Sequence, residues 1–206
     1  MKKGLLCLVK SMEFYEVVKR RRSVRKFKPN RVDEKVLERI LEAGLWAPSA
    51  GNLQPWRFVV VRNRTLKEKL AKIHTEYSRK AWGTFEPEIA KDLASRGGTW
   101  DKEYSANAPV WIVICYKLTS QRGFDENAFA STWCAIENIL LAATAEGLGC
   151  CPYTLTGGEE QAIREVLPIP RDCRMAAIIH LGYTDVKLNQ PKRKGFKVVV
   201  GYERFP

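Results

Sequence analysis

The sequence predicts an α+β domain, in which strands and helices mix without a repeating order. Four runs rich in β-branched or other apolar residues predict strands, at 56–61, 110–116, 150–155 and 175–181. Helical patterns separate these runs without a regular strand–helix–strand spacing, so a doubly wound parallel sheet is disfavoured. The chain has 206 residues and no linker-like stretch, which is enough for one domain with a sizeable core.

The helices are predicted by apolar spacing and by their end signals. Residues 13–22 place apolar side chains on one face, and a capping aspartate opens a helix over 33–46. Thr65 begins a capping box for the next helix. Residues 127–146 are apolar nearly all round, which indicates a buried helix, covered in part by a second subunit. The last predicted helix spans 158–167.

Composition restricts the classes of protein and site. The chain carries 35 Lys and Arg against 23 Asp and Glu, a formal net charge of +12. This charge favours anionic ligands, but no nucleic-acid-binding motif accompanies it, so a basic nucleic-acid-binding module is kept only as an alternative. Six cysteines and two histidines show neither disulfide nor metal-ligand spacing, so no metal is expected.

Residues 1–12 are interpreted as a flexible N-terminal extension, and Met12 is a second candidate for the natural start. Their apolar run is broken by Lys10 and has no small-residue cleavage pattern, unlike a signal peptide. No run approaches the roughly 20 apolar residues that cross a bilayer. We therefore expect a cytoplasmic protein.

The most informative segment is Arg-Arg-Arg-Ser-Val-Arg at 20–25, where the first predicted helix ends. Planar guanidinium groups hold a phosphate by two oxygens at once, and a serine hydroxyl adds a further donor. The alternative is a solvated basic face that is favourable to the helix dipole.

A polar, turn-rich segment follows at 47–56. Two prolines stiffen it, and the amides of Asn52 and Gln54 suit hydrogen bonding to a flat polar ring. A plain turn between a helix and a strand is the alternative. Two weaker pieces come later, Cys-Pro-Tyr-Thr at 151–154 and Pro-Lys-Arg-Lys at 191–194.

These four pieces, in this order over 13–200, resemble the nitroreductase-like flavoproteins. The resemblance implies a central, mostly antiparallel sheet flanked by helices, in an interlocked homodimer with two molecules of flavin mononucleotide (FMN) at its interface. We expect a single domain over 1–206, with a lid at about 78–107 and a C-terminal arm at about 190–206 on the partner subunit. The residues implied in FMN binding are Arg21, Arg22, Ser23 and Arg25 at the phosphate and pyrimidine edge, Pro48, Ser49, Ala50, Asn52 and Gln54 from the other subunit, Pro152, Tyr153 and Thr154 near N5, and Arg193 at the phosphate.

The activity that this resemblance implies is an NAD(P)H-dependent FMN oxidoreductase of nitroreductase type. Hydride passes from NAD(P)H through flavin N5 to a nitroaromatic, quinone or similar flat acceptor, in a ping-pong cycle. No catalytic residue is assigned, although Thr154 is a candidate hydrogen-bond donor to N5. Reductive dehalogenation and fragmentation of the flavin to a benzimidazole are alternative activities of the same fold.

A narrower resemblance to the iodotyrosine deiodinase branch lies in the lid, in Trp-Asp-Lys-Glu-Tyr at 100–104. Lys102 matches a lysine that grips an amino-acid substrate in that branch, and Trp100 and Tyr104 offer aromatic surface for stacking. The glutamate–tyrosine pair that the branch carries earlier in its lid is missing from this chain. A solvated Lys102 and aromatic rings that only pack the lid are the alternatives.

Overall fold

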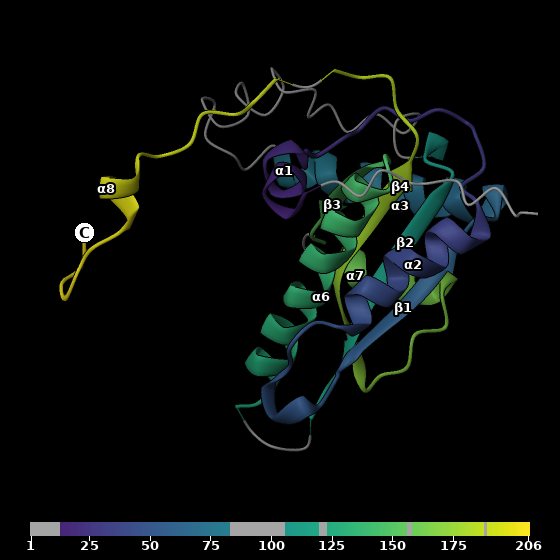
Figure 1. Ribbon diagram of the computed structural model, residues 1–206. Helices are drawn as coiled ribbons and strands as arrows, with labels where there is room; N and C mark the ends of the chain where they lie inside the picture. Colours follow the sequence, from purple (N-terminus) through teal and green to yellow (C-terminus); the bar gives the residue numbers. More distant parts are fainter. Residues whose placement is uncertain (1–12, 83–105, 120–122, 156–157, 188) are drawn as a thin grey trace, which may run out of the picture.

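A four-stranded antiparallel sheet with the order β1-β2-β4-β3 forms the centre of the protein (Figure 1). The computed structural model describes residues 13–82, 106–119, 123–155, 158–187 and 189–206. This arrangement confirms the predicted α+β class and the antiparallel sheet. The strands are β1 (Trp56–Val61), β2 (Val110–Lys117), β3 (Gly149–Tyr153) and β4 (Cys173–Gly182).

The two central strands, β2 and β4, are buried on both faces. Nearly every residue of each is buried, and their register runs from Val110 opposite Leu181 to Lys117 opposite Cys173. Strands of this kind need a covering layer on each side of the sheet.

Helices α2 (Glu34–Leu45) and α6 (Asp125–Ala145) cover one face (Figure 1). The predicted cap of α2 is confirmed, because the Asp33 carboxylate accepts the N–H groups of Lys35 and Val36. By length and composition alone α6 is able to cross a membrane. Here it is a core helix, and its buried residues include Ile136 and Ile139, which pack with the sheet.

Helices α3 (Arg64–Trp82) and α7 (Glu159–Val166) cover the other face. The capping box predicted at Thr65 is wrong, because α3 begins at Arg64. The Leu66 N–H donates to the Asn63 side-chain oxygen at 2.9 Å, so Asn63 supplies the cap.

The first helix, α1 (Phe14–Arg20), is shorter than predicted because Arg21 already has extended backbone, with φ −53° and ψ 128°. We call residues 20–25 the arginine segment. Ser23 forms a parallel bridge with Cys150, and the Val24 N–H donates to the Cys150 carbonyl at 2.9 Å. The arginine segment therefore lies along β3 as an added edge of the sheet.

The other sheet edge carries the second polar segment, and we call residues 48–54 the amide loop. It joins α2 to β1 and contains a short 3₁₀ turn, η1 (Ala50–Asn52). Beyond the sheet, the C-terminal tail extends away from the body and includes α8 (Phe196–Val199) (Figure 1). Its apolar side chains are exposed, Phe205 to 96%.

The close approach of the arginine segment to β3 depends on Gly149. A Cβ at this position would lie 2.8 Å from the Val24 Cβ and Cγ1 atoms. We predict that Gly149→Ala lowers the free energy of unfolding by about 1–3 kcal/mol, measured by urea denaturation, because the added methyl group overpacks the edge. Gly195→Ala is the control, since a Cβ there meets nothing within 4 Å. Equal stability of the two variants would contradict the close contact.

Candidate functional site

The arginine segment sends alternate side chains in different directions, as extended backbone requires. The Arg21 Nε lies 3.8 Å from the Glu137 Oε1 on α6. Arg22 turns its donors onto main-chain carbonyls instead: its Nη1 donates to Lys19 and Arg21, each at 2.6 Å, and its Nε to Asn189 at 3.2 Å. Arg21 is therefore the freer of the two for a ligand.

Arg25 carries a buried donor that this chain leaves unsatisfied. Its Nη1 donates weakly to the Ser23 carbonyl at 3.4 Å, and its Nε is buried without a hydrogen-bond partner among the described residues. A buried donor of this kind is costly unless something accepts it. Burial raises the pKa of the Cys151 thiol, and the charge of Arg25 offsets this only in part. Cys151 is therefore a neutral thiol at pH 7.

The amide loop is held in an unusual backbone conformation. Gly51, Asn52 and Gln54 all have left-handed φ, at 56°, 54° and 45°. For residues other than glycine this costs on the order of 1–3 kcal/mol each and is concentrated at functional sites. The loop holds the strain through its own hydrogen bonds: the Gln54 N–H donates to the Ser49 Oγ at 3.1 Å, and the Gln54 amide donates to the Asn52 Oδ1 at 3.1 Å.

Ser131 on α6 fixes where this loop lies. The Ala50 N–H donates to the Ser131 Oγ at 3.1 Å, and that hydroxyl donates to the Asn127 carbonyl at 2.6 Å. Pro48, Asn52 and Gln54 remain exposed, so a ligand has access to them. Sequence reasoning missed Ser131, because a serine inside an apolar helix carries no local signal of a contact so far along the chain.

The two predicted halves of the site do not meet within one chain. The arginine segment borders β3, and the amide loop leads into β1, at the opposite edge of the sheet. Both are joined to α6, the loop through Ser131 in its first half and the arginine segment through Glu137 further along. A site built from both halves therefore needs more than one copy of the chain.

The end of β3 does lie with the arginine segment. Pro152 is half-buried, Tyr153 is buried and Thr154 is exposed just beyond the strand. Tyr153 packs under the strand, with its ring 3.8 Å from the ring of His74. Burial raises the pKa of Tyr153 well above 10, so its phenol is no acid at neutral pH.

A buried pair supports this strand end from behind. The His74 Nδ1 and the Glu159 Oε1 are 2.7 Å apart and join α3 to α7, and both side chains are buried. The sequence gives no signal that pairs His74 with Glu159, because the two residues lie on separate helices.

The remaining predicted parts of the site are Arg193 and three lid residues. Arg193 is exposed in the tail, beyond the Asn189 carbonyl that Arg22 contacts. Trp100, Lys102 and Tyr104 fall outside the described residues.

Among known protein families, the nitroreductase family matches this chain over residues 18–183. An iodotyrosine deiodinase of Thermotoga neapolitana is 27% identical over 191 residues, which is 93% of this chain and 98% of that protein. A Methanothermobacter thermautotrophicus protein with the provisional name NADH dehydrogenase/NAD(P)H nitroreductase is 33% identical over 182 residues, 85% of this chain and 79% of that protein.

Among solved structures, an oxidised iodotyrosine deiodinase bound to FMN and 3-iodo-L-tyrosine has a similar fold. Its TM-score is 0.82 at 26% identity, over 94% of this chain and all of that one. The match covers both edges of the sheet described above.

His180, behind the end of β3, makes stability depend on pH. Burial lowers its pKa well below 6.5, and electrostatic contributions from the neighbouring His74, Lys67 and Arg25 act in the same direction. Below pH 6.5 the unfolded chain therefore binds more protons than the folded one, and this part of the stability is lost as the pH falls, by up to about 1.4 kcal/mol per pH unit.

We predict that His180→Phe removes this dependence. Urea denaturation of both proteins between about pH 5 and pH 7 measures it, because the stability difference between them should shift steadily below pH 6.5 and stay constant above it. A constant difference at every pH would mean that His180 titrates normally.

Proposed function

This chain belongs to the nitroreductase family, and we propose that it is an FMN-dependent oxidoreductase that works as a homodimer. The observation that supports this most directly is the separation of the two polar halves onto opposite edges of one sheet. Each half matches one end of FMN in chemistry, and a second copy supplies what one chain lacks.

The arginine segment fits the phosphate and the pyrimidine edge of FMN. Arg21 lies beside the sheet edge with only a long 3.8 Å ion pair to Glu137, and the Ser23 backbone borders β3. The buried, unsatisfied Nε of Arg25 fits an acceptor atom of the flavin ring, which would remove the cost of leaving it unpaired. Arg22 would mainly stabilise the segment, because its Nε and Nη1 already donate to carbonyls. Arg193 would reach the phosphate from the tail.

The amide loop fits the flavin ring of the other subunit. Pro48, Ser49 and Ala50 would line the ring, while the exposed Asn52 and Gln54 amides would face its polar edge. The loop is preformed by its own hydrogen bonds, so little ordering is required when the ring binds.

The exposed side of α6 supports a dimer with the required geometry. Asn127, Ala130, Cys134 and Glu137 form an exposed stripe along one side of this helix. A twofold axis perpendicular to α6 pairs two such helices antiparallel, so the Ser131 half of one approaches the Glu137 half of the other. That pairing brings the amide loop of one chain toward the arginine segment of its partner. The exposed apolar tail, with Phe196 and Phe205, would then cover partner surface.

Bound FMN supplies the redox chemistry, by accepting and passing on hydride. The chain supplies binding and charge. Arg25 and the loop amides would lower the energy of negative charge at the polar edge of the ring. Thr154 would donate a hydrogen bond near the reacting nitrogen, because it is exposed directly beyond β3. The buried His74–Glu159 pair and Tyr153 would keep this strand end in place.

For the reaction we propose NAD(P)H as reductant and a flat nitroaromatic or quinone as acceptor, because the proposed ring face is open to stacking. Reductive dehalogenation is a second candidate, favoured by the similarity to iodotyrosine deiodinases in sequence and fold. A cytoplasmic location remains our expectation for either activity.

The first test is the visible absorption spectrum of the purified protein, followed by anaerobic addition of NADH or NADPH. We expect flavin bands that bleach on reduction. Parallel assays with nitroaromatics and with 3-iodotyrosine then separate the two candidate activities. A protein that stays colourless after incubation with FMN would overturn the proposal.

Two substitutions test the two halves of the proposed site. Arg21→Ala removes a charge-assisted contact of about 1.5–3 kcal/mol, so FMN should bind roughly 10- to 150-fold more weakly. Asn52→Gly removes the amide while keeping a residue that tolerates left-handed backbone, and a smaller loss of a few-fold is expected. Fluorescence titration with FMN measures both.

Arg171→Ala is the matched control, because Arg171 is exposed in the turn before β4 and belongs to neither half. Its FMN affinity should equal that of the parent protein. If Arg21→Ala and Asn52→Gly bind FMN as tightly as this control, the residues are placed wrongly even though the protein is a flavoprotein.

A further inference from the structure

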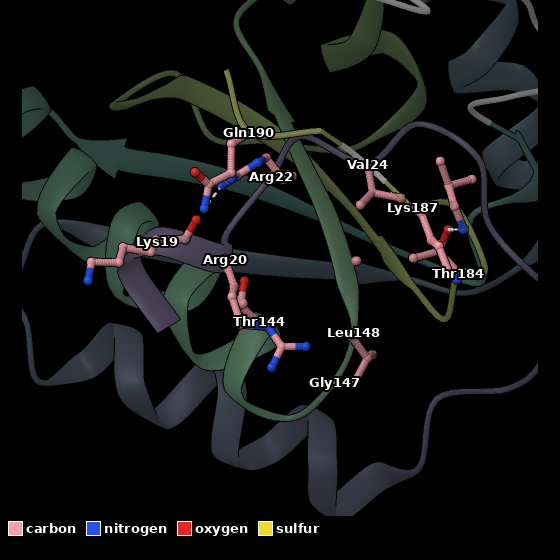
Figure 2. A pocket seen from close by; sticks show the side chains of 12 residues that line it. Lys19, Arg20, Arg22, Val24, Thr144, Gly147, Leu148, Thr184, Lys187 and Gln190 are labelled. Carbon is pink, nitrogen blue, oxygen red and sulfur yellow. Dashed lines mark hydrogen bonds between the residues drawn. The ribbon is translucent and has the colours of Figure 1, made fainter. Parts of the chain in front are cut away.

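A second basic site lies on the opposite side of the arginine segment from Arg21. It is a cavity of about 460 Å³ between the end of α1, the entry to β3 and the chain after β4 (Figure 2). This volume falls in the range of small-molecule pockets. Four cations line it, Lys19, Arg20, Arg22 and Lys187, together with Thr144, Thr184 and Gln190.

No carboxylate lines this cavity, and the two acids next to its lining residues on the β3 and β4 sides are engaged elsewhere. Glu146 is paired with Arg39 at 2.7 Å, and Asp185 with Lys28 at 2.6 Å. Within the described part of the chain, Lys19, Arg20 and Lys187 have no ion-pair partner. The lining of the cavity therefore carries positive charge without a carboxylate beside it.

The cavity is distinct from the proposed FMN site because of the alternation along the arginine segment. Arg22 and Val24 of the extended part face the cavity, and Lys19 and Arg20 reach it from the last turn of α1, whereas Arg21, Ser23 and Arg25 do not line it. Arg21 instead approaches Glu137 on α6. One extended segment thus presents cations on two sides, and the FMN proposal uses only one of them.

Arg22 is built into the wall of the cavity. Its Nε and Nη1 donate to three carbonyls, which fix the guanidinium and tie α1 to the chain after β4. The Nη2 has no hydrogen-bond partner in the described residues and remains available. Figure 2 shows Arg20 on the α1 side of the cavity and Lys187 on the side of the chain after β4.

We propose that this cavity binds a small phosphorylated molecule through its phosphomonoester group. Guanidinium groups and an ammonium around one space match the several oxygens and the double charge of such a group. Val24, Leu148 and Val186 offer an apolar surface for the organic part of the molecule. The 2′-phosphate of NADPH and a separate phosphorylated metabolite share this chemistry.

The test is titration calorimetry of the FMN-loaded protein with inorganic phosphate at low ionic strength. Arg20→Ala and Lys187→Ala should each weaken phosphate binding about tenfold or more, because each removes a charged donor. Lys35→Ala and Arg171→Ala, which remove exposed cations that do not line the cavity, should leave phosphate binding unchanged. FMN content should stay at the parent level in all four variants.

Steady-state kinetics with NADPH and NADH identify the source of the phosphate. A higher KM for NADPH alone in the Arg20 and Lys187 variants supports the reductant as the ligand. Unchanged KM values together with weakened phosphate binding support a separate metabolite.

The proposal is overturned if the parent protein binds no phosphate, or if the two control variants lose binding equally. It is also overturned if Arg20→Ala and Lys187→Ala lose FMN, because the cavity would then be part of the flavin site. A colourless parent protein that still binds phosphate in this pattern would contradict the flavin proposal alone.

Discussion

Burial of both faces of β2 and β4 is the constraint on which the remaining structure depends. These strands cannot face water, so α2 and α6 must cover one side and α3 and α7 the other. Unused backbone hydrogen-bonding groups are then left at the sheet edges, beside β1 and β3. Both polar segments lie at these edges. The core therefore determines where the two polar segments lie, and also why they are far apart within one chain.

The local features of the fold were predictable from the sequence, and the long-range features were not. The run Trp-Arg-Phe-Val-Val-Val gave β1 its observed bounds, and Asp33 marked the start of α2, because both signals lie within a few residues. The start of α3 was misplaced, since Asn63 and Thr65 are both acceptable caps and only tertiary packing chooses between them. The end of α1 was set by pairing with β3, which no local pattern records.

The same division applies to the candidate site. The arginine segment and the amide loop were recognisable because each concentrates its donors in a short stretch. The residues that hold these segments in place were not recognisable. The roles of Ser131, Glu159 and the unsatisfied Nε of Arg25 depend on contacts with residues far away in the sequence. The cavity around Arg20 and Lys187 is of this kind too, since its two sides come from opposite ends of the chain. Alternation along one extended segment then gives neighbouring arginines different partners.

The parallel bridge between Ser23 and Cys150 also has a consequence for the order of assembly. The arginine segment, at residues 20–25, leaves the ribosome long before the strand that it lies against, at residues 149–153. Contacts between such distant residues form late, since a long loop must be closed first. During synthesis the nascent chain therefore carries an unshielded basic stretch. Its edge of the sheet is completed only when β3 has emerged, so the basic stretch stays unpaired for much of synthesis.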